Sequence, residues 1–138
     1  MRVKTRVLDS WAILEWIAGR QPACDLVAGL LSEAEENRAR LLMSVINAGE
    51  VYYCLRKNHG LELAESWRES SPTMPITFEA PTAPEIWSAA AIKAEFPIAY
   101  ADAFAAALSR KYRYPLMTGD PEFRMVSQLE LDWIGRSA

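Results

Sequence analysis

Four acidic side chains lie in apolar stretches of this 138-residue chain: Asp9, Glu50, Asp102 and Asp120. Asp9 and Asp120 each end a short apolar run of the kind that forms a buried strand. Asp102 lies near the start of an otherwise apolar helical pattern, and Glu50 lies among Ala, Val and Tyr residues. Carboxylates in apolar surroundings repel one another and resist burial unless a counter-charge is present. A hard divalent cation such as Mg²⁺, which prefers oxygen ligands, would supply that charge.

Each acid also has an ordinary structural interpretation. Asp9 or Asp120 alone would serve as a helix N-cap or a turn residue, and Asp102 would suit the positive start of a helix. Glu50 has the weakest structural explanation, because a glutamate in an apolar helical face has no routine structural role. Glu122 is interpreted as a first-turn acid, with a fifth metal ligand as the less favoured alternative. The four acids together indicate a metal site more strongly than any one of them alone.

Strand and helix patterns alternate along the chain, and this alternation is what would bring the acids together. Strands are expected at 3–8, 41–43, 74–78, 115–118 and 129–134. Helices are expected to begin just after Ser10 and at Pro22, Val45, Leu61, about Glu85 and Tyr100, with a short helix from Pro121. The pattern predicts one α/β domain over residues 1–138 with a mainly parallel sheet. Ligands bind beyond the carboxyl ends of the strands in such sheets, at the edge where Asp9 and Asp120 are expected.

Local signals set the ends and the buried faces of the helices. Ser10 and Ser44 are expected to be N-caps, and Gly19 and Gly60 are expected to end their helices. The helix over 100–113 is apolar on almost every side and is therefore expected in the interior. In the second helix, the apolar spacing predicts inward-facing side chains at Leu26, Val27, Leu30 and Leu31.

Composition excludes several other kinds of site. A single histidine, His59, rules out a pair of histidines acting as acid and base, and Cys24 and Cys54 have neither zinc-ligand nor disulfide-framework spacing. The net charge of −3 argues only weakly against nucleic-acid binding, because a metal site would itself carry several of the negative charges. No apolar run approaches the roughly 18 residues of a membrane span, and the start lacks a signal-peptide layout. A cytoplasmic protein without a membrane partner is expected.

Four segments in this order resemble the PIN domain family, and within it the VapC-type toxin ribonucleases. They are VLDS at 7–10, NAGEVYY at 47–53, ADAFAAAL at 101–108 and TGDPEF at 118–123. The resemblance implies a Rossmann-like, three-layer α/β/α sandwich and a Mg²⁺- or Mn²⁺-dependent endoribonuclease. It assigns to the catalytic metal centre the residues Asp9, Glu50, Asp102 and Asp120. It also implies an RNA substrate, a homodimer and inhibition by a cognate VapB-type antitoxin of a type II toxin–antitoxin system.

Several residues are expected to support this centre. The hydroxyls of Ser10 and Thr118 would position waters or acids, and Asn47 lies one helical turn before Glu50. Ala99 departs from the family, since relatives often carry a serine just before the Asp102 segment. A weaker expectation is contact between RNA and three cations that otherwise suit a helix C-terminus, Arg110, Lys111 and Arg113. The five tryptophans are interpreted as packing residues rather than base-stacking ones.

The expected reaction is phosphodiester hydrolysis by a metal-activated water, which would leave a 5′-phosphate on the product. One alternative is a non-catalytic PIN-like binding module, whose sign would be the loss of one or more acids, and none is missing. A second alternative is an Asp-dependent phosphotransfer domain. Such domains need a further acid beside the first strand or a later lysine, and Trp11 stands where the second acid of a phosphohydrolase would be.

Overall fold

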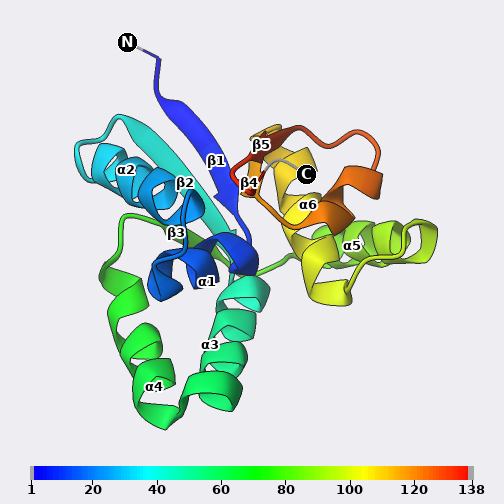
Figure 1. The fold of residues 1–138 in the computed structure, drawn as a ribbon. Coiled ribbons are helices and arrows are strands. Elements are labelled where there is room, and N and C mark those ends of the chain that lie inside the picture. Colours follow the sequence, from blue (N-terminus) through cyan, green and yellow to red (C-terminus); the bar gives the residue numbers. More distant parts are fainter. Residues whose placement is uncertain (1, 137–138) are drawn as a thin grey trace.

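The computed structural model describes residues 2–136, in which a five-stranded parallel sheet forms the centre of the molecule (Figure 1). The strands are β1 (Lys4–Leu8), β2 (Ala39–Ser44), β3 (Thr77–Glu79), β4 (Leu116–Thr118) and β5 (Leu131–Trp133). Their order in the sheet is β3-β2-β1-β4-β5, and every neighbouring pair is parallel. The prediction of an α/β fold with a mainly parallel sheet is therefore confirmed.

Helices connect the strands, as the alternation of patterns predicts. The α-helices are α1 (Ser10–Ala18), α2 (Ala23–Glu35), α3 (Val45–His59), α4 (Leu61–Ser70), α5 (Ala83–Glu95) and α6 (Tyr100–Tyr112). Two short 3₁₀ helices, η1 (Ser71–Thr73) and η2 (Pro121–Met125), precede β3 and follow β4. Within residues 2–136, no helix is both long and apolar enough to cross a membrane.

Side chains alternate between the two faces of the sheet and divide the core into two layers. Val7 packs with α5 and α6, whereas the next residue, Leu8, packs with α1 and α2. The same alternation separates Leu116 from Met117 on β4. Because successive strand residues point to opposite faces, a helical layer covers each side of the sheet (Figure 1). This is the expected three-layer α/β/α arrangement.

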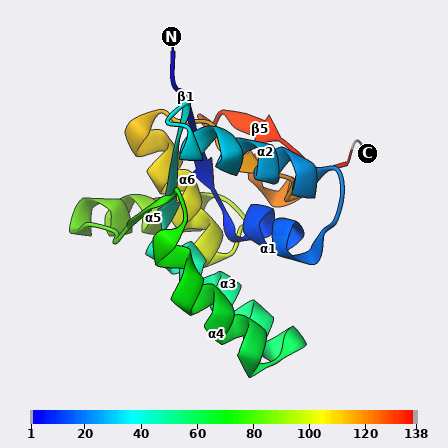
Figure 2. The same cartoon turned by 90° about the vertical axis from the view of Figure 1, so that its left-hand side faces the viewer.

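The carboxyl edge of the sheet is extended by a helical hairpin. Helices α3 and α4 run beyond the ends of the strands and form one lobe, seen at the bottom of Figure 1 and again in Figure 2. Their packing includes Trp67 of α4, whose indole N–H donates to the Ala48 carbonyl of α3 over 3.0 Å. Helix α6 lies in the core as predicted, with every residue from Asp102 to Ser109 buried.

Strand bounds differ from the predicted ones where pairing is limited. The third strand was expected at 74–78 but begins at Thr77, because Pro75 has no N–H with which to join a ladder. The last strand was expected at 129–134 but covers Leu131–Trp133, the three residues that pair with the three of β4. The second strand is longer than expected, because it pairs with β1 on one side and with β3 on the other.

Two local predictions are wrong. The N-cap of α1 is Asp9 rather than Ser10, because the Asp9 backbone is extended and its carboxylate accepts from the Ala12 N–H. Ser10 is already helical. Leu26 is 47% exposed rather than inward-facing, because α2 buries the narrower stripe of Ala23, Val27, Leu30, Leu31 and Ala34. The predicted caps at Ser44 and Gly19 are confirmed.

Candidate active site

The parallel sheet gathers the predicted acids at one edge. Asp9 follows β1 and Asp120 lies two residues after β4, which is the immediate neighbour of β1. Glu50 lies in the second turn of α3 and Asp102 in the first turn of α6, and both helices start at this edge. Their proximity is seen at Asp102, because the charges of Glu50, Asp120 and Asp9 all raise its pKa.

Asp9 and Asp120 are linked through the hydroxyl of Thr118. This hydroxyl donates to Asp9 Oδ2 over 2.5 Å and accepts from the Asp120 backbone N–H over 3.1 Å. The other oxygen of Asp9 accepts from the Ala12 N–H over 2.9 Å, and Asp120 in turn accepts from the Glu122 N–H. Both acids therefore act as N-caps, of α1 and η2 respectively. An ionised carboxylate has about four acceptor positions, so these caps leave capacity for another ligand.

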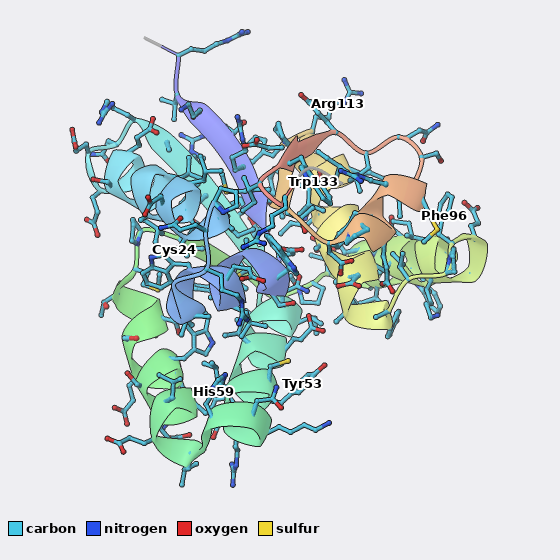
Figure 3. The ribbon with its side chains drawn as sticks, in the orientation of Figure 1. Cys24, Tyr53, His59, Phe96, Arg113 and Trp133 are labelled. Atoms are coloured by element: carbon cyan, nitrogen blue, oxygen red, sulfur yellow. The ribbon has the colours of Figure 1, made fainter. Side chains whose placement is uncertain are left out.

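Glu50 is held by two hydroxyl groups. Ser10 donates to Glu50 Oε1 over 2.5 Å, and Tyr53 donates to Glu50 Oε2 over 3.3 Å. Tyr53 projects from α3 at the side of the hairpin (Figure 3). Ser10 is 7% exposed, so this contact connects the start of α1 to α3 within the edge of the sheet.

Three carboxylates come close enough to share one ion. Among residues 2–136, Asp102, Asp120 and Glu122 each offer a ligand atom, and these atoms lie within 4.8 Å of one another. Glu122 was the less favoured ligand candidate, interpreted as a first-turn acid of the helix after Pro121. It is indeed in the first turn of η2, and the same turn brings its carboxylate beside Asp102. Glu122 is therefore a first-turn acid whose carboxylate also lies near those of Asp102 and Asp120.

The crowding of acids raises the pKa of two of them. Burial raises the pKa of Asp9 to about 7, and the charges of Asp120 and Glu50 add to the increase, while hydrogen bonds from Thr118 and Ala12 oppose it. Burial also raises the pKa of Asp102 to about 8, with further contributions from its acidic neighbours. Without a cation, both side chains are therefore held partly or largely protonated near neutral pH.

No side-chain cation of the described part of the chain neutralises this cluster. The salt bridges within residues 2–136 involve other acids, such as Glu15 with Arg20 and Glu85 with Lys111. Mg²⁺ and Mn²⁺ prefer oxygen ligands, and the carboxylates of this cluster offer several oxygen atoms close together without a neutralising side chain. The residues present therefore fit a divalent cation.

Asn47 ties α3 to the start of α6. Its Nδ2 donates to the Ala101 carbonyl over 3.0 Å, which lies next to Asp102 in the chain. The side chain is fully buried, and its Oδ1 has no hydrogen-bond partner among the described residues. Ala99 is the N-cap of α6 and makes no side-chain capping bond, so Asn47 supports a helix start that lacks a cap.

The three cations proposed for RNA contact lie elsewhere. Eight residues of helix separate Arg110 from Asp102, which places it about 12 Å further along the helix axis. Arg110 donates to the Ser127 carbonyl, and Lys111 forms an ion pair of 2.5 Å with Glu85. Arg113 ends the helix at a positive φ of 58°. Its side chain lies at the opposite end of the molecule from Tyr53 (Figure 3). Their contact with RNA stays a prediction.

A cavity beside the acids contains residues that sequence reasoning did not assign to the site. It has a volume of about 330 Å³ and is lined by two tryptophans that had been interpreted as packing residues, Trp11 and Trp133. Arg124 also lines it, with its guanidinium 3.8 Å from the centre of the Trp133 ring. Their closeness to predicted acids in the sequence could have indicated them, since Trp11 lies two residues after Asp9 and Arg124 lies four residues after Asp120.

A protein-family model matches most of the chain. Residues 6–129 match the model of the PIN domain. The chain belongs to the PIN domain family. The match covers the segments that contain all four predicted acids, and it confirms the resemblance found in the sequence. A search of functionally curated proteins finds no matching sequence.

Solved structures of similar fold include toxin–antitoxin proteins. A chain of VapBC2 from Rickettsia felis, bound to a DNA fragment of its promoter, superposes with a TM-score of 0.70 at 15% identity, covering 93% of this chain and 97% of that one. VapC20 from Mycobacterium tuberculosis, a toxin that cleaves the sarcin–ricin loop, superposes with a TM-score of 0.71 at 19% identity, covering 86% of this chain and 92% of that one. A chain of a toxin–antitoxin complex from Klebsiella pneumoniae superposes with a TM-score of 0.64 at 17% identity, covering 86% of this chain and 89% of that one. At these identities the likeness concerns the fold of this PIN domain.

Proposed function

We propose that this PIN domain is a divalent-metal-dependent endoribonuclease and the toxin of a VapBC-type toxin–antitoxin pair. The observation that carries the proposal is the acid cluster, in which Asp9, Glu50, Asp102, Asp120 and Glu122 meet without a neutralising side chain. Support comes from the family match and from similar folds that are described as VapC or VapBC proteins. We further propose a cytoplasmic location, a homodimer and a VapB-type antitoxin as partner.

The proposed metal ligands are Asp102, Asp120 and Glu122, with Asp9 and Glu50 completing the negative wall. These residues would hold a divalent cation, Mg²⁺ or Mn²⁺, which would supply the positive charge needed to attract a phosphate and to lower the pKa of a water. Two hydroxyl groups orient the acids beside the proposed ligands. Thr118 donates to Asp9, and Ser10 donates to Glu50. Asn47 fixes the backbone next to Asp102.

The structure disfavours the phosphotransfer alternative. Asp9, the acid that would accept a phosphoryl group, is 1% exposed, and both of its oxygens already accept hydrogen bonds. A carboxylate this deeply buried is poorly exposed to an incoming phosphoryl group. The non-catalytic alternative differs from our proposal in one measurable respect, which is whether RNA is cleaved.

Cleavage of purified cellular RNA in the presence of Mg²⁺ or Mn²⁺ tests the proposed activity. Asp102→Asn should reduce the rate by roughly 100-fold or more, because it removes a charged ligand rather than a supporting group. Glu122→Gln should also lower the rate and weaken Mn²⁺ binding in calorimetry. The exposed Glu36→Gln is the matched control and should cleave normally. Folding of each variant is checked by thermal unfolding.

Sequencing of the product ends adds a second readout. Products with 5′-phosphates are expected from metal-dependent hydrolysis. Metal binding without cleavage by the wild-type protein would instead support a non-catalytic PIN module. Expression with and without the neighbouring open reading frame tests the toxin role, and growth arrest that the neighbour fails to relieve would refute the antitoxin partnership.

A further inference from the structure

A cavity next to the acid cluster combines aromatic rings with positive charge. Its lining includes the indoles of Trp11 and Trp133 and the side chains of Arg20, Arg124 and Arg136. Its volume of about 330 Å³ lies at the small end of the roughly 300–1,000 Å³ that ligand pockets occupy. A space of this size suits one nucleotide-sized group rather than a folded partner.

The cavity adjoins the elements that carry two of the acids. Its wall includes Gly119 and Pro121, the residues on either side of Asp120. Trp11, whose ring packs against Gly119, also lines the cavity and comes from the first turn of α1, whose N-cap is Asp9. A polymer with its scissile phosphate at the acids would therefore have an adjoining unit within reach of this cavity.

The charge of the cavity is opposite to that of the acid cluster. Glu15 is the acid of the lining and is already paired with Arg20 over 2.6 Å. Arg124 and Arg136 form no salt bridge within the described residues 2–136. Two uncompensated guanidinium groups in a chain of net charge −3 favour an anionic ligand at this place.

The aromatic geometry adds a preference for a flat ring. The guanidinium of Arg124 lies over the ring of Trp133, 3.8 Å from its centre, and Trp133 stands on the edge strand β5 (Figure 3). The Trp133 indole N–H donates to the Arg136 carbonyl over 3.4 Å, which fixes the ring orientation. Unstacked bases of single-stranded RNA bind to planar surfaces of this kind, made of aromatic rings and arginine.

We propose that this cavity is a subsite for one unpaired nucleotide of the RNA substrate, adjoining the scissile phosphodiester. The base stacks on the Arg124–Trp133 pair, and its phosphate interacts with the guanidinium groups. The inference rests on the proposed ribonuclease function and adds to it a binding position for one base next to Asp120. It also gives two of the five tryptophans a role beyond packing.

Binding of a fluorescein-labelled, 12-nucleotide single-stranded RNA of mixed sequence, measured by anisotropy with Mg²⁺, tests the subsite. Asp102→Asn is used as the background so that the probe stays intact. In this background Arg124→Ala and Trp133→Ala should each raise the Kd roughly 5- to 100-fold, the range seen when a base loses its stacking partner. Trp133→Phe keeps an aromatic ring and should bind more tightly than Trp133→Ala.

Two exposed residues outside the cavity provide matched controls. Arg38→Ala removes an arginine at the α2–β2 turn, and Trp87→Ala removes a tryptophan of α5 that is 75% exposed. Both should leave the Kd unchanged. A blunt RNA duplex of the same length should bind more weakly than the single strand, because its bases are not free to stack.

The outcomes separate the subsite from the catalytic proposal. Unchanged RNA affinity in Arg124→Ala and Trp133→Ala, both with wild-type thermal unfolding, overturns the subsite even if the wild-type protein cleaves RNA. Equal affinity for the duplex also overturns it. Loss of affinity in the cavity variants alone, together with a wild-type protein that cleaves nothing, supports nucleotide binding in the cavity but overturns its position beside a scissile bond, along with the ribonuclease.

Discussion

The hydroxyl of Thr118 donates a hydrogen bond of 2.5 Å to Asp9, a residue 109 positions away in the chain. The bond joins the ends of β1 and β4, which are neighbours in the sheet. The same hydroxyl accepts from the backbone N–H of Asp120. One buried side chain therefore fixes the relative positions of two acids of the proposed centre.

Thr118→Val keeps the shape of this side chain and removes its hydroxyl. Asp9 would lose a buried hydrogen bond, so we expect a loss of about 1–3 kcal/mol in the free energy of unfolding, measured in urea. The Thr118 bond lowers the pKa of Asp9, so its loss should raise that pKa further and reduce cleavage more at pH 7 than at pH 8.5. Thr118→Ser retains the hydroxyl and is the control. Equal stability of the valine and serine variants would contradict the role of this bond.

The pH dependence of stability should report the cluster directly. In the folded protein the pKa values of Asp9 and Asp102 are raised from 3.8 to about 7 and about 8. Between these limits the folded state binds more protons than the unfolded state, so the metal-free protein should lose stability as the pH rises from about 4 to about 8. Thermal unfolding in EDTA measures this change. The stability of Asp102→Asn should decrease less over this pH range. A decrease equal to that of the wild type would argue against a raised pKa at Asp102.

Metal should reverse this loss. A cation that binds the folded state stabilises it by about 2.7 kcal/mol at 100 times its Kd. Because ligand carboxylates must be ionised, the increase in Tm on adding Mg²⁺ or Mn²⁺ should be larger at pH 8 than at pH 5.5. Asp102→Asn should lose most of this increase, whereas Glu36→Gln should keep it. An equal increase at both pH values would be inconsistent with metal binding to these acids.

Gly119 should tolerate no side chain. A Cβ at this position would lie 2.2 Å from Cη2 of Trp11 and 2.6 Å from the Cα of Gly135. Gly119→Ala should therefore cost about 1–3 kcal/mol in stability through overpacking. Gly29→Ala on α2 meets nothing within 4 Å and should instead stabilise by about 0.5–1 kcal/mol. Urea unfolding of both variants measures the contrast, and a neutral Gly119→Ala would show that Trp11 moves freely.

A capping side chain at the start of α6 should stabilise the protein. Ala99 has the extended backbone of an N-cap but no side-chain bond to the first turn. Ala99→Ser should add about 1 kcal/mol and raise the Tm by about 3 °C. Ala28→Ser, at an exposed position inside α2, should instead cost about 0.5 kcal/mol. A decrease in stability on Ala99→Ser would show that this helix start has no free N–H for the hydroxyl.

The sequence by itself determined the fold class, most of the helix bounds and the meeting of the four acids. These conclusions follow from local rules. Hydrophobic periodicity distinguishes strands from helices, and parallel strands place their carboxyl ends at one edge. Helix α3 was predicted with its observed bounds, because Ser44 and Gly60 are strong signals for the two ends of a helix.

Only the tertiary structure decided which groups touch. The contact of Ser10 with Glu50 depends on how α1 packs against α3. The approach of Glu122 to Asp102 and the pairing of Arg124 with Trp133 join residues from different elements. Such contacts depend on the rotation and spacing of packed elements, which periodicity leaves open. The same limit explains Leu26, since an apolar residue at the border of a helical face is buried only if a neighbouring element covers it.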